Sequence, residues 1–334
     1  MRDLDTLPKT ELHLHIEGTL EPELAFALAE RNGVALPFDS VEALREAYDF
    51  DDLQSFLDLY YATMAVLRTE RDFTELTLAY LERASAQGLA HVEVFFDPQA
   101  HTSRGVPFEQ VVDGIVAGLA IGQERFNVTS ALILCFLRDQ PVASALETLE
   151  LAASTRLASI DGIGLDSAEV GYPPSLFAEV YEQAAELGLR LVAHAGEEAP
   201  PAYIVEALDV LGVERVDHGV QAAQDPALLA RLAAERIPLT VCPLSNLRLR
   251  VVDDLAAHPL PKLIEAGVLV TINSDDPAYF GGYVGDNYAA IREALSLTDA
   301  QLAQLARGGV EASWASEPRK RELLEAIDLW ESAE

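Results

Sequence analysis

Short apolar runs alternate along most of the chain with longer segments in which apolar residues recur at helical spacing. Several of the runs are apolar on both faces, as the strands of a helix-covered parallel sheet are. Eight such runs are found, at residues 11–16, 90–96, 129–136, 160–165, 189–193, 214–216, 238–241 and 268–273. Eight strands alternating with helices, in a chain longer than the roughly 250 residues typical of this class, predict an α/β fold of the (β/α)8 TIM barrel type.

An insertion of about residues 22–87 follows the first predicted strand. Four segments there have helical spacing, at 21–31, 41–48, 51–67 and 70–87, and we expect them to cover the barrel mouth. The chain from 286 onward also has only helical spacing, which predicts a helical C-terminal tail. No Gly/Ser linker or shift in composition marks a boundary, so we expect a single domain over residues 1–334.

The charge balance narrows the range of possible binding partners. Asp and Glu number 55 against 23 Lys and Arg, for a net charge of −32. Such a chain repels phosphate backbones and anionic lipid, so we expect neither a nucleic-acid nor a membrane partner but a small molecule. Two cysteines in apolar runs, no apolar leader and no run long enough to span a bilayer predict a soluble cytoplasmic protein. Whether it forms a homo-oligomer stays open.

Polar side chains stand at the ends of several predicted strands, where the active sites of such barrels lie. The first strand ends in His13 and His15, which at i and i+2 face the same side and can share one ion. The fifth strand ends in His194. The eighth is followed by Asp275 and Asp276, adjacent carboxylates that are costly unless a cation or proton offsets one of them.

Further groups at strand ends could act as acid or base. Glu197 and Glu198 follow the fifth strand, although either can simply favour the start of a helix there. His218 ends the sixth strand. Three imidazoles and one carboxylate suit a zinc site with room for water, leaving a Glu, a His and an Asp for acid, base and substrate-holding roles. We interpret the remaining histidines as structural or surface residues: His91, His101 and His258.

Five motifs in order resemble the adenosine deaminase superfamily over essentially the whole chain. They are PKTELHLHIEGTLEPEL (8–24), VAHAGEE (192–198), DHG (217–219), CPLSN (242–246) and NSDDPAYFGGY (273–283). The resemblance implies one zinc ion per subunit, bound by His13, His15, His194 and Asp275. It further implies a zinc-activated water that attacks C6 of a 6-aminopurine, oriented by His218 and Asp275, with Glu197 protonating N1 and Asp276 binding the N7 edge.

At two positions the chain differs from adenosine deaminases and resembles the adenine deaminases (type 2) of the same superfamily. Adenosine deaminases use an Asp after the second histidine on the ribose, where this chain has Glu17, and a Gly where it has Glu169. We expect both glutamates to bind substrate, with Glu169 accepting a hydrogen bond from the ring N–H of free adenine. The expected reaction is therefore conversion of adenine to hypoxanthine and ammonia in purine salvage. Tyr172 departs from the adenine deaminase pattern, and a nucleoside substrate, 6-aminodeoxyfutalosine or adenosine, is the alternative.

Two other classes of protein fit less well. Barrel amidohydrolases that bridge two metals use a carboxylated lysine at a strand end, and none of the three lysines here stands at one. A binding module with a purely structural metal would need a closed ligand shell. The additional Glu197, His218 and Asp276 favour an enzyme instead.

Overall fold

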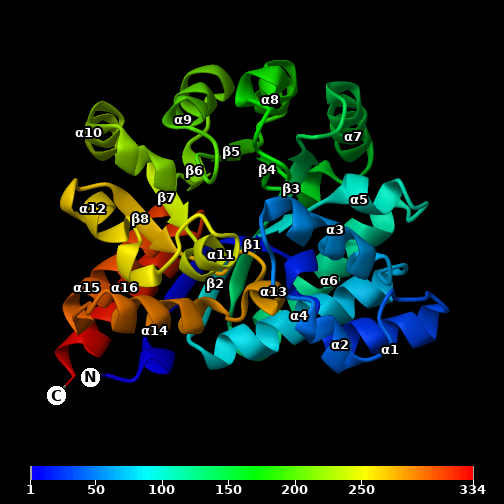
Figure 1. Cartoon of the computed structure of the whole chain (residues 1–334), viewed down its shortest axis with the longest axis horizontal. Helices are drawn as coiled ribbons and strands as arrows, with labels where there is room; N and C mark the ends of the chain where they lie inside the picture. Colours follow the sequence, from blue (N-terminus) through cyan, green and yellow to red (C-terminus); the bar gives the residue numbers. More distant parts are fainter. Residues whose placement is uncertain (1, 334) are drawn as a thin grey trace.

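The computed structural model describes residues 2–333 and forms a barrel of parallel strands surrounded by helices (Figure 1). Within these residues, eight strands pair in chain order. They are β1 (Lys9–His15), β2 (Leu89–Phe96), β3 (Thr129–Leu137), β4 (Gly162–Asp166), β5 (Arg190–Ala195), β6 (Arg215–His218), β7 (Pro238–Val241) and β8 (Leu269–Ile272). Each coincides with a predicted apolar run, so the predicted (β/α)8 barrel is confirmed.

Four helices lie between β1 and β2, in the predicted insertion: α1 (Pro22–Asn32), α2 (Val41–Glu46), α3 (Leu53–Met64) and α4 (Glu70–Ala86). Reciprocal side-chain and backbone hydrogen bonds begin α3 at Asp52 and Ser55, and α4 at Thr69 and Asp72. α4 packs along α6 and so belongs to the outer ring of helices.

The other helices follow the later strands or form the C-terminal tail. They are α5 (Pro98–Thr102), α6 (Phe108–Phe126), α7 (Val142–Thr155), α8 (Ala178–Glu186), α9 (Pro201–Glu206), α10 (Pro226–Glu235), α11 (Pro243–Arg248), α12 (Leu260–Glu265), α13 (Pro277–Phe280), α14 (Val284–Ala294), α15 (Asp299–Ala312) and α16 (Glu317–Ser332). The tail is helical as predicted, and α15 packs against β8 and β1. Among residues 2–333, none of the helices has the length and apolar character needed to cross a membrane.

The barrel closes between β1 and the residues just after β8. The His15 N–H donates to the Asp275 carbonyl and the Asp275 N–H donates to the His13 carbonyl, each at 3.1 Å. Asp275 has a φ of 67°, an uncommon backbone conformation for a residue other than glycine. These two hydrogen bonds hold it there, which brings its carboxylate next to both histidines of β1.

Candidate active site

A cavity lies at the carboxyl ends of the strands, covered by the inserted helix α3. Its apolar lining is Leu53, Phe56, Leu57 and Tyr60 from α3, with Leu249 and Phe280. Its polar lining is His15, Tyr61, Asp97, Asp166, Ser167, His194, Glu197, His218, Asp275 and Asp276. The insertion therefore covers the barrel mouth, with an apolar face of α3 opposite the polar strand ends.

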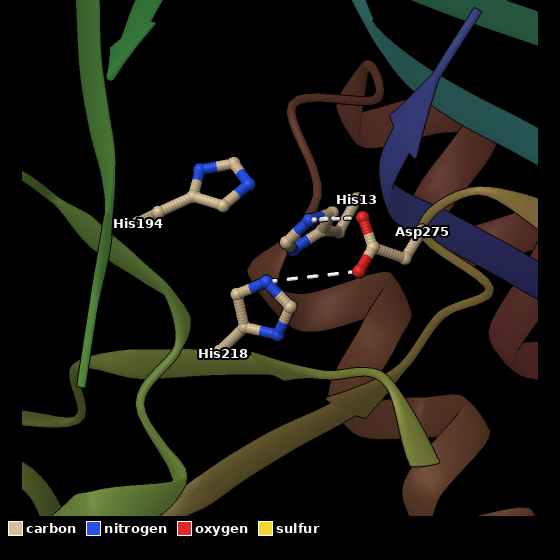
Figure 2. A group of neighbouring side chains, drawn as sticks. All are labelled: His13, His194, His218 and Asp275. Atoms are coloured by element: carbon tan, nitrogen blue, oxygen red, sulfur yellow. Dashed lines mark ion pairs between the residues drawn. The ribbon is translucent and has the colours of Figure 1, made fainter. Parts of the chain in front are cut away.

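Imidazoles lie close to the Asp275 carboxylate: Figure 2 shows His13 and His218 paired with it and His194 on the far side of His13. The Oδ1 atom of Asp275 lies 3.2 Å from His13 Nε2 and 3.5 Å from His15 Nε2. The Nε2 atoms of His15 and His194 are 3.1 Å apart. Ligands about 2.0–2.1 Å from a tetrahedral zinc ion lie about 3.3 Å apart. Among the described residues, the four donors that all lie within 4.8 Å of one another are His13, His194, His218 and Asp275, whereas His15 is grouped with Asp275 and Asp276. The expected set of His13, His15, His194 and Asp275 therefore stays a prediction, with three of its pairs at spacings close to those of zinc ligands.

His218 lies next to this group but contacts the other carboxylate oxygen. Its Nε2 is 3.7 Å from Asp275 Oδ2 and 3.5 Å from Glu197 Oε2. It also belongs to a group of four close donors with His13, His194 and Asp275. Its position between two carboxyl groups favours a role in proton transfer over one as a fourth nitrogen ligand.

Hydrogen bonds behind His13 orient its ring. Its Nδ1 lies 2.9 Å from Thr240 Oγ1, which in turn donates to Asp217 Oδ1 at 2.9 Å. Because the Thr240 hydroxyl hydrogen points to Asp217, the ring donates its Nδ1–H and keeps a lone pair on Nε2. Within residues 2–333 that Nε2 has no hydrogen-bond partner. A hydrogen-bond partner on the outer ring nitrogen, here Thr240, is typical of metal-binding histidines.

Burial lowers the pKa of three imidazoles of the site, those of His15, His194 and His218, and so keeps them neutral, the form that binds metal. It lowers the pKa of His15 to about 4 and that of His218 to about 3, with repulsion from His13 adding to both. Burial alone would raise the pKa of Asp275, but the imidazoles of His13, His218 and His15 hold that pKa well below its usual range. At neutral pH the site therefore combines the ionised Asp275 carboxylate with the neutral imidazoles of His15, His194 and His218.

Two other carboxyl groups of the cavity have pKa values shifted in the opposite direction. Burial, followed by the charges of Asp275 and Glu169, raises the pKa of Glu197 well above its usual value. Burial and the charge of Asp275 do the same for the pKa of Asp276. Both groups can therefore carry a proton and donate a hydrogen bond at neutral pH, which suits Glu197 to the role of an acid.

The two glutamates expected to bind substrate make other contacts. Glu17 is fully buried and pairs through Oε1 with His101 Nε2 at 2.7 Å and with the Asp97 N–H at 3.2 Å. Glu169 accepts hydrogen bonds at 2.6–3.1 Å from four successive backbone N–H groups, those of residues 196–199. Among the described residues, the lining of the cavity includes neither glutamate. Glu169 therefore holds the backbone that carries Glu197.

The Glu169→Gln protein is expected to lose about 10- to 100-fold in kcat while keeping its metal and nearly the same KM, because displacing a catalytic group by about 1 Å costs this much. An amide accepts through one oxygen, so one or more of the four N–H groups loses its acceptor and Glu197 shifts. Steady-state kinetics and metal analysis on the same sample measure this. An unchanged kcat would contradict the positioning role.

Two candidate functional residues were not predicted from the sequence, although they too are polar residues at the ends of strands. Asp97 directly follows β2 and Asp166 ends β4, so both are carboxylates at strand ends, and both line the cavity. The three histidines set aside by the sequence are all at most 3% exposed: His91, His101 and His258. The alternative that they lie on the surface is therefore wrong, and each has a buried hydrogen-bond partner.

Comparison with known sequences agrees with this geometry. The profile of the adenosine deaminase family matches residues 8–330. A protein from Streptomyces coelicolor named adenine deaminase is 65% identical over 308 residues, which cover 92% of this chain and 90% of that protein. One of the same name from Rhodospirillum rubrum is 58% identical over 320 residues, 96% of each chain.

Solved structures show the same fold. The crystal structure of adenine deaminase from Arthrobacter aurescens superposes with a TM-score of 0.96 at 58% identity, over 98% of this chain and 99% of that one. An amidohydrolase from Burkholderia ambifaria, solved with bound zinc, has a TM-score of 0.89 at 28% identity, over 98% and 92%. This chain belongs to the adenosine deaminase family.

Proposed function

We propose that this protein converts adenine and water to hypoxanthine and ammonia in purine salvage, with one zinc ion per subunit. The observation that carries the proposal is the 65% and 58% identity to proteins named adenine deaminase over more than nine-tenths of the chain. The chain is a hydrolytic deaminase, and the cavity contains the groups that this chemistry needs.

A zinc ion held by His13, His15, His194 and Asp275 would serve as a Lewis acid and lower the pKa of a nearby water. His218 Nε2 lies 3.5 Å from Glu197 and 3.7 Å from Asp275, and it accepts a proton as the water oxygen attacks C6. Glu197 meanwhile protonates N1, so that the C6–N1 double bond becomes a single bond, and the added oxygen makes C6 tetrahedral.

Two further proton transfers complete the reaction. His218 gives its proton to the amino group, the C6–N bond breaks, and ammonia leaves. The hydroxyl proton on C6 passes to Glu197, leaving the carbonyl of hypoxanthine and restoring the acid. Asp276 donates to N7, while Phe56 and Phe280 offer apolar surface to the ring faces. Atoms and charges balance, and no further reactant is needed.

Ammonia release from adenine, adenosine and 6-aminodeoxyfutalosine, measured side by side with metal content on the same sample, tests the proposal. We expect turnover of adenine alone, with about one zinc per chain. Turnover of a nucleoside with adenine inert would overturn the choice of substrate and leave the deaminase class intact. Full activity in metal-free protein would overturn the zinc assignment.

A further inference from the structure

The cavity contains two buried carboxyl groups that the reaction does not use. Asp97 and Asp166 are 2% and 3% exposed, and both line the cavity. Asp166 Oδ2 lies 3.5 Å from His15 Nδ1, on the side of the ring opposite the predicted metal position. The two carboxyl groups also face each other: burial and the charge of Asp166 raise the pKa of Asp97, which therefore carries the proton between them. Asp166 thus lies between His15 and Asp97, and the second oxygen of Asp97 is left to be explained.

The surroundings of Asp97 leave one of its oxygens free. Its backbone N–H donates to Glu17 Oε1 at 3.2 Å, and Glu17 is fixed in turn by His101. Asp97 Oδ1 is buried, yet within residues 2–333 it has no hydrogen-bond partner. Buried polar atoms are nearly always hydrogen-bonded, so this oxygen marks a position where a ligand donor fits.

The chemistry of the purine identifies the donor. With C6 facing His218 and Asp275, N1 at Glu197 and N7 at Asp276, the remaining ring nitrogens, N3 and N9, lie on the opposite edge. In free adenine N9 carries a hydrogen, whereas in a nucleoside it carries the sugar. His15 lies within 4.8 Å of Asp97 and Asp166 on one side and of Asp275 and Asp276 on the other. Asp97 therefore borders the same cavity as the groups that face C6 and N7.

We propose that Asp97 Oδ1 accepts the N9–H of free adenine and thereby selects the free base against nucleosides. A carboxyl group accepts through this oxygen whether it is ionised or protonated, because the proton is then on the other oxygen. A sugar at N9 would leave Asp97 without a donor and would press against two buried carboxyl groups. This role rests on the proposed adenine deaminase function and replaces the one expected of Glu169, whose oxygens are occupied by residues 196–199.

A comparison of adenine with 9-methyladenine, which lacks the N–H, tests the role in zinc-loaded protein. The unmodified protein is expected to prefer adenine on the order of 10⁴-fold in kcat/KM. In Asp97→Ala the preference falls about 10- to 100-fold, mainly through a higher KM for adenine, with zinc content unchanged. Calorimetric binding of hypoxanthine and 9-methylhypoxanthine is expected to show the same loss of discrimination without turnover.

Two further variants keep the result interpretable. Asp97→Asn preserves side-chain volume and still offers an amide oxygen as acceptor, so it is expected to keep most of the preference, which separates loss of the acceptor in Asp97→Ala from misfolding. Tyr61→Phe removes a cavity hydroxyl that already pairs with Ser167 Oγ at 3.2 Å, and we expect it to affect both bases equally. If the unmodified protein does not deaminate adenine, the proposed function fails. If it does but Asp97→Ala keeps the full preference for adenine, the role of Asp97 alone is overturned.

Discussion

The Glu197→Gln protein is expected to release ammonia from adenine about 10²- to 10⁴-fold more slowly than the unmodified protein while retaining its metal. Glutamine has nearly the same size and keeps the backbone hydrogen bond to Glu169, but it has no acidic proton to transfer to N1. Single-turnover rates of ammonia release, with metal content measured on the same sample, check this expectation. Near-normal turnover by the Glu197→Gln protein would show that the acid has been misassigned.

Glu198→Gln is the matched control. Glu198 is the next residue, its N–H also donates to Glu169, and its side chain is exposed. We expect this variant to turn over adenine at a near-normal rate.

The pH dependence of the rate distinguishes Glu197 from Glu198 further. Because burial raises the pKa of Glu197, the acid is protonated at neutral pH, and the rate falls as the pH rises through that value. This alkaline decrease is expected to persist in Glu198→Gln and to be absent in Glu197→Gln.

The His15→Ala protein is expected to lose both bound metal and activity. The His15 ring contacts His194 and Asp275, so its removal leaves three of the four proposed zinc ligands. Metal affinity falls by more than the roughly 10- to 100-fold that removal of an outer partner costs. Competition with a chelator, followed by metal analysis, measures the affinity independently of turnover.

Two other histidines serve as controls. His91→Gln changes a buried ring at the start of β2, bonded to Thr129 Oγ1 at 2.8 Å, and is expected to keep its metal and its activity. His218→Ala is expected to keep the metal and lose rate, because His218 contacts the other oxygen of Asp275. Retention of zinc in His15→Ala with its loss in His218→Ala would reverse the assignment of these two residues.

Much of this molecule can be predicted from local pattern alone. Strands buried on both faces are continuous apolar runs, and helices have a different period, so the apolar runs agree with all eight strands to within two residues at each end. In a parallel barrel every strand ends at the same face, so His13, His194, His218 and Asp275 had to converge wherever the intervening helices lie.

Only the tertiary structure decided which side chains meet. Glu169 was expected on the substrate but accepts four N–H groups from a turn 27–30 residues away, and no local pattern reveals that partner. The pairing of Glu17 with His101 spans 84 residues. Asp97 satisfied the same strand-end criterion as Asp275, yet its free oxygen is defined only by the neighbours that surround it. The sequence alone thus determined the fold and the face that bears the chemistry, because both follow from periodicity and chain direction. Roles within the site depended on three-dimensional packing, because a carboxyl group acts according to the donors within about 3 Å of it.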